Sequence, residues 1–126
     1  MCKTIGIGTD ICQISRIEKA IEKAHFYERV FTEDERLYLK EKGRARAASA
    51  AAMFAAKEAV SKALGTGFAK GVSVSEISVI HNENGAPGIR LTGGAQVRLE
   101  AIGGKEVLVS LSHEGDMAMA FALIQG

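Results

Sequence analysis

Residues 44–64 read RARAASAAAMFAAKEAVSKAL, and Gly65-Thr66-Gly67 follows directly. Alanine has the highest helix propensity of the amino acids, and its small side chain lets neighbouring elements pack closely. Gly65 suits the left-handed backbone conformation that commonly ends a helix. The stretch therefore predicts one long, closely packed helix that ends at Gly65.

Two further helices are predicted before this one. A short strand over residues 4–9 ends at Asp10, and an amphipathic helix follows, because four isoleucines recur at helical spacing. These are Ile11, Ile14, Ile17 and Ile21. Thr32 begins the next helix, since Glu35 stands three residues on and can complete a capping box. That helix is expected to run to about Lys42.

The second half of the chain predicts mainly strands. Residues 72–80 alternate between apolar and polar side chains, with a change of phase at Glu76 that indicates a bulge. The pair Asn84-Gly85 is a tight-turn signal. Residues 92–102 are expected to form one more helix.

Two more strands are predicted near the end of the chain. Residues 106–112 alternate, as in a strand with one buried face. Residues 117–124 are apolar on both faces, so we expect this strand to be buried on both sides. Helices precede a hairpin-rich sheet, which predicts an α+β fold.

Length and composition are those of one globular domain. The chain has 126 residues, 47% hydrophobic and 25% charged, which predicts a single domain over residues 1–126. No apolar run approaches the ~20 residues of a membrane span, and the N-terminus lacks the apolar core of a signal peptide. Cys2 and Cys12 show neither zinc-site nor Cys-x-x-Cys spacing, so we expect free thiols and a reducing cytoplasm.

The charge distribution favours an acidic protein partner over a nucleic acid. The formal net charge is only +1 and aromatic residues are 6% of the chain, which argues against a nucleic-acid-binding protein. Residues 1–74 nevertheless hold 13 Lys and Arg against 9 Asp and Glu. This excess leaves room for a local basic surface that meets an acidic partner.

Asp10 and Glu58 are candidate ligands of a hard cation. Asp10 closes a strand before a helix, where it can equally be the helix N-cap. Glu58 and Lys62 lie one turn apart on one helix face. They form either a surface ion pair or an acid that holds a metal beside a lysine that meets phosphate. The spacing leaves these alternatives open.

Three other segments contain candidate functional residues. Gly65-Thr66-Gly67 either offers backbone N–H groups to a phosphate or only ends the helix. At the end of a strand, His113 is either a simple turn residue or the partner of Ser112 in a nucleophilic pair. The pair is disfavoured, because neighbouring residues of a strand point to opposite faces, whereas Ser110 and Ser112 share one. A basic stretch is either a solvated helix junction or a contact for an anionic ligand or a carrier. It comprises Lys40, Lys42, Arg44 and Arg46.

Six segments, taken in order, are far more specific together than separately. They are GIGTDI (6–11), SRI (15–17), RVFTEDE (29–35), FAAKEAVSKALGTG (54–67), NGAP (84–87) and SLSH (110–113). In sequence and order they closely resemble the holo-[acyl-carrier-protein] synthases, the small bacterial type of 4′-phosphopantetheinyl transferase. The resemblance spans nearly the whole chain, and residues 54–67 are its most specific part.

The resemblance implies an α+β fold in which a small antiparallel-rich sheet packs with the long Ala-rich helix. It implies a homotrimer with active sites between protomers. The implied reaction transfers 4′-phosphopantetheine from coenzyme A to a serine of an acidic acyl carrier protein. Mg²⁺ is required, adenosine 3′,5′-bisphosphate is the other product, and fatty acid biosynthesis is the expected context. The alternative is a non-catalytic module that binds coenzyme A or a nucleotide on the same scaffold.

The family pattern also implies roles for individual residues. Asp10 and Glu58 would hold Mg²⁺, and Lys62 would lie near the phosphates, so these three are the expected catalytic residues. The implied coenzyme A contacts are Lys62, Gly65, Thr66, Gly67, Asn84, Gly85, Pro87, Ser110, Ser112 and His113.

The family docks its carrier protein on the helix after Asp10. The residues implied for docking are Arg16, Lys19, Ala20, Lys23, Phe26 and Arg29, with Ile17 as a further apolar contact. One departure from the pattern is Met53, where the family often has a basic residue. Any phosphate or ribose contact made there would be lost or taken over, and the candidates to take it over are Arg44, Arg46 and Lys57.

Overall fold

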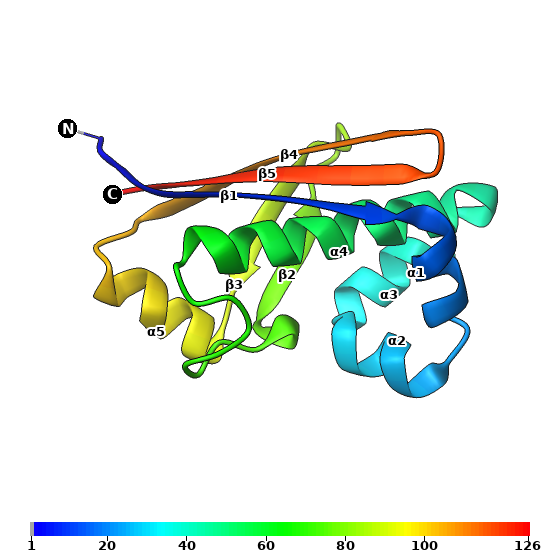
Figure 1. Cartoon of the computed structure of the whole chain (residues 1–126), viewed down its shortest axis with the longest axis horizontal. Coiled ribbons are helices and arrows are strands. Elements are labelled where there is room, and N and C mark those ends of the chain that lie inside the picture. The colour runs from blue at the N-terminus through cyan, green and yellow to red at the C-terminus, as the bar shows by residue number, and fades with distance from the viewer. Residues whose placement is uncertain (1) are drawn as a thin grey trace.

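The computed structural model describes residues 2–126, which form one three-stranded and one two-stranded sheet with helices around them (Figure 1). The three-stranded sheet has the antiparallel order β1-β5-β4, and the two-stranded sheet pairs β2 with β3. Helix α4 lies along one face of the larger sheet, with α1, α2 and α3 at one end of the molecule and α5 at the other. Within these residues, no helix is both long enough and apolar enough to cross a membrane.

The element boundaries are as follows. The helices are α1 (Ile14–Ala20), α2 (Ala24–Val30), α3 (Glu33–Lys40), α4 (Arg46–Ala63) and α5 (Gly93–Ala101). The strands are β1 (Thr4–Gln13), β2 (Ile77–His81), β3 (Pro87–Leu91), β4 (Glu106–Glu114) and β5 (Met117–Gln125).

Helix α4 and the sheet pack closely because the contacting side chains are small. Along β5 the residues that face α4 are Ala118, Ala120 and Ala122, and all three are fully buried. On β1 the facing residues include two glycines. A Cβ on Gly8 would lie 2.0 Å from the carbonyl oxygen of Ala59, and one on Gly6 would lie 2.2 Å from that of Ala63. Only glycine therefore lets β1 approach the helix this closely.

The predicted long helix and its neighbours are confirmed in type. Helix α4 is followed by Gly65 at φ +82°, the left-handed conformation expected there. The Thr32 capping box is formed, because Thr32 Oγ1 accepts from the Glu35 N–H and Glu35 Oε1 accepts from the Thr32 N–H. The hairpin turn at Asn84-Gly85 and the helix within residues 92–102 are also present.

The prediction for the start of the chain was wrong in its boundary. Strand β1 continues past residue 9 to Gln13, so the helix begins at Ile14 and Asp10 is not its N-cap. The reason is tertiary: β5 offers a pairing partner for every residue from Gly6 to Gln13, including Met119 opposite Ile11. This long pairing outweighs the local helical spacing of the isoleucines.

Two strand predictions also need correction. The change of phase at Glu76 is a 3₁₀ turn, Val74–Glu76, capped by Ser73, and not a bulge. Strand β5 is buried on its alanine face only. On its other face, Met119 is 42% exposed and Phe121 is 40% exposed. The described chain thus leaves one face of its main sheet uncovered.

Candidate active site

Asp10, Glu58 and Lys62 converge where β1 runs alongside α4. The Lys62 Nζ atom lies 3.1 Å from Asp10 Oδ1 and donates to the Thr9 carbonyl oxygen at 3.0 Å. Glu58 lies one helical turn before Lys62. Its carboxyl group is close enough to Asp10 for the Asp10 charge to raise its pKa. The structure thus gathers the three residues that the sequence predicted as a catalytic group.

The fold explains why this cluster forms. Gly6 and Gly8 bring β1 against α4, and Asp10 lies two residues further along the same face of the strand. Glu58 and Lys62 lie on the alanine-rich helix α4, beside the residues that contact β1. Glu58 is partly buried and Lys62 is exposed. The close packing of β1 against α4 therefore places the carboxylates of Asp10 and Glu58 near one another.

The electrostatics of the cluster suit a divalent cation. Burial is the main cause that raises the pKa of Glu58. Asp10 raises it further, and Lys62 opposes both. Two carboxylates that repel one another at a partly open site favour a cation between them. Mg²⁺ commonly takes one or two protein carboxylates and completes its shell with water and substrate phosphates. Within residues 2–126, no group of three or more His, Cys, Asp and Glu side chains is placed to hold a metal ion. Asp10 and Glu58 would supply two carboxylates to Mg²⁺.

The glycine loop after α4 shows the geometry of a helix end. The Gly65 N–H donates to the Lys62 carbonyl oxygen at 2.9 Å, and the Gly67 N–H donates to that of Ser61 at 3.0 Å. The Thr66 N–H also donates to Ser61, at 3.3 Å. These bonds match the helix-ending alternative. A coenzyme A contact by Gly65, Thr66 or Gly67 stays a prediction.

The end of β4 is separated from the cluster by a strand. Ser110 pairs with Phe121 and Ser112 with Met119, so both serines lie on the uncovered face of the sheet. His113 pairs with Ala118 on the opposite face. Ser112 and His113 line an open hollow of about 520 Å³. The hollow extends across β5 to Ile11 on β1, the residue after Asp10, but Asp10, Glu58 and Lys62 do not line it.

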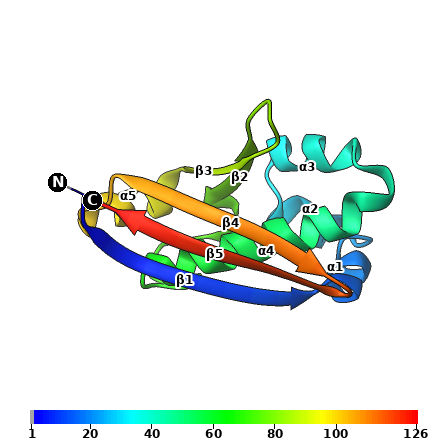
Figure 2. The same ribbon diagram turned by 90° about the horizontal axis from the view of Figure 1, so that it is seen from above.

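The β2–β3 hairpin lies away from the cluster. Asn84 and Gly85 are exposed at its tip, and Pro87 begins β3. The loop is shaped by Asn82, whose Oδ1 atom accepts from the Asn84 and Ala86 N–H groups at 2.9 Å each. Figure 2 shows the tip projecting on the side of α3, whereas β1 forms the opposite edge of the molecule. Within one chain the tip does not reach Asp10.

Comparison with known proteins identifies the family. The model of the 4′-phosphopantetheinyl transferase superfamily matches residues 6–122. The chain belongs to this superfamily. The holo-[acyl-carrier-protein] synthase of Gluconobacter oxydans is 48% identical over 96% of this chain and 82% of its own length. The transferase is therefore an enzyme of the holo-[acyl-carrier-protein] synthase type, as the sequence motifs predicted.

Solved structures support the same assignment. The holo-[acyl-carrier-protein] synthase of Neisseria meningitidis matches the transferase with a TM-score of 0.87 and 34% identity, over 97% of this chain and 98% of that one. The Helicobacter pylori enzyme, solved in complex with coenzyme A, matches with a TM-score of 0.81 and 33% identity, over 94% of this chain and 98% of that one. The α+β fold is thus shared across nearly the full length.

The residues predicted for carrier docking occupy α1, α2 and the turn between them. Arg16, Lys19, Lys23 and Arg29 are exposed and available to an acidic partner. Ala20 and Phe26 are partly buried. The Phe26 and Phe54 rings pack with their centres 6.3 Å apart. Ile17 is only 3% exposed, so its prediction as an apolar contact was wrong: it belongs to the core beneath α1.

Two residues of the α4 motif are core residues in the transferase. Met53 is 1% exposed and cannot itself replace a basic ligand contact. Lys57 is fully buried and bound to Glu35, so it was wrongly considered as a substitute contact. Arg46 lies 4.9 Å from the centre of the Tyr27 ring. Arg44 is the exposed member of the candidates.

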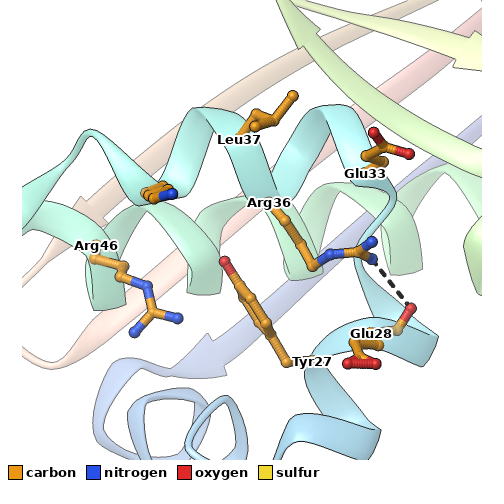
Figure 3. A pocket seen from close by; sticks show the side chains of 7 residues that line it. Tyr27, Glu28, Glu33, Arg36, Leu37 and Arg46 are labelled. Carbon is orange, nitrogen blue, oxygen red and sulfur yellow. Dashed lines mark hydrogen bonds between the residues drawn. The ribbon is translucent and has the colours of Figure 1, made fainter.

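A separate hollow of about 430 Å³ opens beside α2 and α3 (Figure 3). Tyr27, Leu37 and Arg46 line it, with Glu28 and Glu33 as acidic neighbours. Arg36 also lines the hollow, but its Nη1 atom already donates to the carbonyl oxygens of Phe31 and Glu28 (Figure 3). The lining carries both signs of charge, and none of it belongs to the Asp10 cluster.

Cys12 lies near the cluster but is unsuited to act as a nucleophile. Its Sγ atom donates to the Ala51 carbonyl oxygen at 3.2 Å. Burial, followed by the charge of Asp10, raises the pKa of this thiol to about 11. Both cysteines are free thiols, as predicted.

Sequence reasoning missed Asp116, which anchors the start of α1. The Asp116 side chain accepts from the Ser15 N–H at 3.0 Å and from the Ser15 hydroxyl at 2.7 Å. Its carbonyl oxygen accepts from the Ile14 N–H at 2.7 Å. The β4–β5 turn thereby fixes the first turn of α1. No local pattern could reveal this, because the partners are 101 residues apart.

Proposed function

We propose that this chain transfers the 4′-phosphopantetheine group of coenzyme A to a serine hydroxyl of an apo acyl carrier protein. The reaction requires Mg²⁺, takes place in the cytoplasm and serves fatty acid biosynthesis. The observation that carries the proposal is the convergence of Asp10, Glu58 and Lys62 on one partly open site. The names of the relatives, and the coenzyme A bound to the Helicobacter pylori enzyme, agree with it.

The chemistry fits the charges of the cluster. The serine oxygen forms a bond to the phosphorus that carries pantetheine, and the bond from that phosphorus to the bridging oxygen breaks. Adenosine 3′,5′-bisphosphate leaves with that oxygen. Asp10 and Glu58 would hold Mg²⁺, which supplies positive charge for the phosphates during transfer. Lys62 has half of its side chain exposed and can meet a phosphate oxygen as a point charge.

The serine proton must also leave. The carboxylates of Asp10 and Glu58 are the basic groups that this chain supplies at the cluster. A carboxylate can accept the proton directly or through one water molecule. The proton acceptor is thus part of the same cluster.

A homotrimer with active sites between its protomers completes this arrangement. The uncovered sheet face is an apolar patch of the kind that marks an interface between proteins. Its members are Ile7, Ile11, Leu108, Met117, Met119 and Phe121. The predicted coenzyme A contacts on the hairpin and at the end of β4 lie apart from the Asp10 cluster in one chain. A neighbouring copy would bring them to it, with Asn84, Gly85 and Pro87 near the adenine and Ser110, Ser112 and His113 near the phosphates.

The carrier protein would dock on α1 and α2. Four exposed basic residues and the partly exposed Phe26 offer a surface for an acidic partner with an apolar contact. The N-terminal end of α1 follows directly from β1, which carries Asp10. A carrier on these helices would therefore hold its serine close to the cluster.

Intact-mass spectrometry tests the proposal. Apo acyl carrier protein is incubated with the purified chain, coenzyme A and Mg²⁺, and a second sample contains EDTA. The expected result is a gain of one 4′-phosphopantetheine group that is absent with EDTA. Binding of coenzyme A without any transfer, across several carriers, would contradict the proposal and support a non-catalytic binding module.

A further inference from the structure

Glu35 and Lys57 form a fully buried ion pair that the proposed chemistry does not use. Both side chains are 0% exposed, and Lys57 Nζ lies 2.6 Å from Glu35 Oε1. Burying an ion pair gains little stability over apolar residues of similar size. The pair is therefore better explained by how it positions the backbone around it than by the stability it adds.

The pair binds the free edge of strand β2. Lys57 Nζ donates to the Ile77 carbonyl oxygen at 2.5 Å, and Glu35 Oε2 accepts from the Val79 N–H at 2.7 Å. On the other edge, the Glu76 carbonyl oxygen accepts from the Thr92 N–H. Successive residues of a strand point their backbone groups to opposite edges, so Ile77 and Val79 face away from β3. The two side chains thus take the place of a third strand.

The same pair joins three elements. Glu35 lies on α3, where Oε1 also accepts from the Thr32 N–H at 2.8 Å, and Lys57 lies on α4 directly before Glu58. Through Ile77 and Val79 the pair holds β2, and with it the whole hairpin. Two other side-chain links join the hairpin to α3: Thr32 Oγ1 lies 2.8 Å from Ser78 Oγ, and Arg90 pairs with Asp34. The Arg90–Asp34 pair is exposed at both ends, so the buried charged link is the one from Glu35 and Lys57.

We propose that Glu35 and Lys57 are positioning residues, which fix the β2–β3 hairpin to α3 and α4 so that its tip can contact coenzyme A. This inference rests on the proposed function, because that function assigns Asn84, Gly85 and Pro87 to the nucleotide. Neither residue touches the substrate. They act through the backbone of β2.

Two double variants test this role. Glu35→Leu/Lys57→Met replaces the pair by apolar side chains of similar length and is expected to fold, because the charges are removed together. Glu35→Gln/Lys57→Gln removes the charges and keeps an acceptor for the Val79 N–H and a donor for the Ile77 carbonyl oxygen, while the Thr32 N–H loses its acceptor. Coenzyme A affinity is measured by calorimetry with Mg²⁺ and without carrier, so that no turnover occurs. Circular dichroism and the oligomer mass establish that each variant is folded.

The apolar variant is expected to bind coenzyme A at least about tenfold more weakly, with an unchanged KM for the carrier protein. The amide variant is expected to stay within about threefold of wild type. The matched control is Asp34→Asn, which breaks the exposed pair with Arg90 between α3 and β3 and is expected to leave coenzyme A affinity unchanged.

Three outcomes would overturn the inference: wild-type affinity in the folded apolar variant, equal losses in both double variants, or a tenfold loss in a folded amide variant. If the apolar variant fails to fold, near-wild-type affinity in the amide variant supports the role of the hydrogen bonds. Failure of the wild-type chain to bind coenzyme A would instead contradict the proposed function itself.

Discussion

The pKa of Glu58 responds to burial and to the charges of both other residues of the cluster. Burial and the charge of Asp10 raise its pKa, and the Lys62 ammonium one turn away opposes them. Burial and a neighbouring negative charge disfavour an unpaired ionised carboxylate, so this group is stabilised by binding a cation or a proton. The Lys62 ammonium also lies 3.1 Å from Asp10 Oδ1, so one positive charge is shared by both carboxylates.

At the same scale, Arg16 tests the docking surface. It is exposed on α1, and an acidic carrier should meet it directly. We expect Arg16→Glu to weaken carrier binding about tenfold or more at low salt, with unchanged coenzyme A affinity, because a favourable charge becomes a repulsive one. Calorimetry with each ligand checks this.

Lys105→Glu is the matched control, since it makes the same charge change at an exposed residue between α5 and β4. If Arg16→Glu and Lys105→Glu weaken carrier binding equally, α1 is not the docking surface. Equal losses of carrier and coenzyme A affinity in Arg16→Glu would lead to the same conclusion.

Individual residues show what the sequence could and could not reveal. Asp10, Glu58 and Lys62 were predicted as a group from motif order, and the structure brings them together. Lys57 was misjudged, because a lysine in an exposed pattern and a lysine paired in the core look alike until the partner is known. Glu35 was recognised as a capping residue, but its second oxygen atom binds β2, 44 residues away.

Among the elements, β1 and α4 determine where the site forms. Their separation is set by Gly6 and Gly8, which contact the helix backbone. We expect Gly8→Ala to cost about 3 kcal/mol or more in the free energy of unfolding, because a methyl group cannot fit against the Ala59 carbonyl oxygen without moving the backbone. Urea unfolding checks this, with Gln13→Ala as an exposed control on the same strand. A loss below 1 kcal/mol, about the size of a surface change, would contradict this view of the packing.

Glu76 gives an element-scale prediction with a pH dependence. Its carboxylate accepts from the Ser73 N–H before the 3₁₀ turn and from the Gly94 N–H at the start of α5, and these bonds lower its pKa below 4.5. A lowered pKa in the folded state stabilises the protein above pH 4.5, and this stability is lost as the pH falls through the lowered value.

We therefore expect Glu76→Gln to reduce the free energy of unfolding by about 1 kcal/mol at pH 7. The difference from wild type should shrink steadily below pH 4.5. Thermal unfolding across the pH range measures it, with the exposed Glu106→Gln as control. A difference that grows toward acid pH would contradict the assignment.

The boundaries of elements were harder to predict than their types. The isoleucine spacing favoured a helix from Ile11, but pairing with β5 extends β1 to Gln13. The apolar pattern of β5 was correctly recognised as strand. The prediction that both faces of β5 are buried was wrong for the described chain, in which the second face is uncovered. An apolar sequence pattern does not distinguish burial within one chain from burial against another copy.

For the whole molecule, the uncovered apolar face of the main sheet is the surface on which the proposed homotrimer would assemble. We expect Phe121→Lys to dissociate the assembly into single chains and to lower transfer at least about tenfold, because a buried unpaired charge is costly at an apolar interface. Analytical ultracentrifugation and the transfer assay check this. The control, Val97→Lys, places the same charge on an exposed apolar residue of α5 outside the sheet. A fully active single chain would contradict a site shared between protomers.

The most direct test of the catalytic centre compares the wild-type chain with Asp10→Asn and Glu58→Gln. Each is incubated with coenzyme A, Mg²⁺ and an apo acyl carrier protein, and intact mass spectrometry follows the carrier over time. Loss of a metal ligand removes several kcal/mol of transition-state stabilisation, about a thousandfold in rate or more. We expect rapid gain of one 4′-phosphopantetheine group with wild type and almost none with either folded variant. Transfer at the wild-type rate by either variant would show that the Asp10–Glu58 cluster is not the catalytic centre.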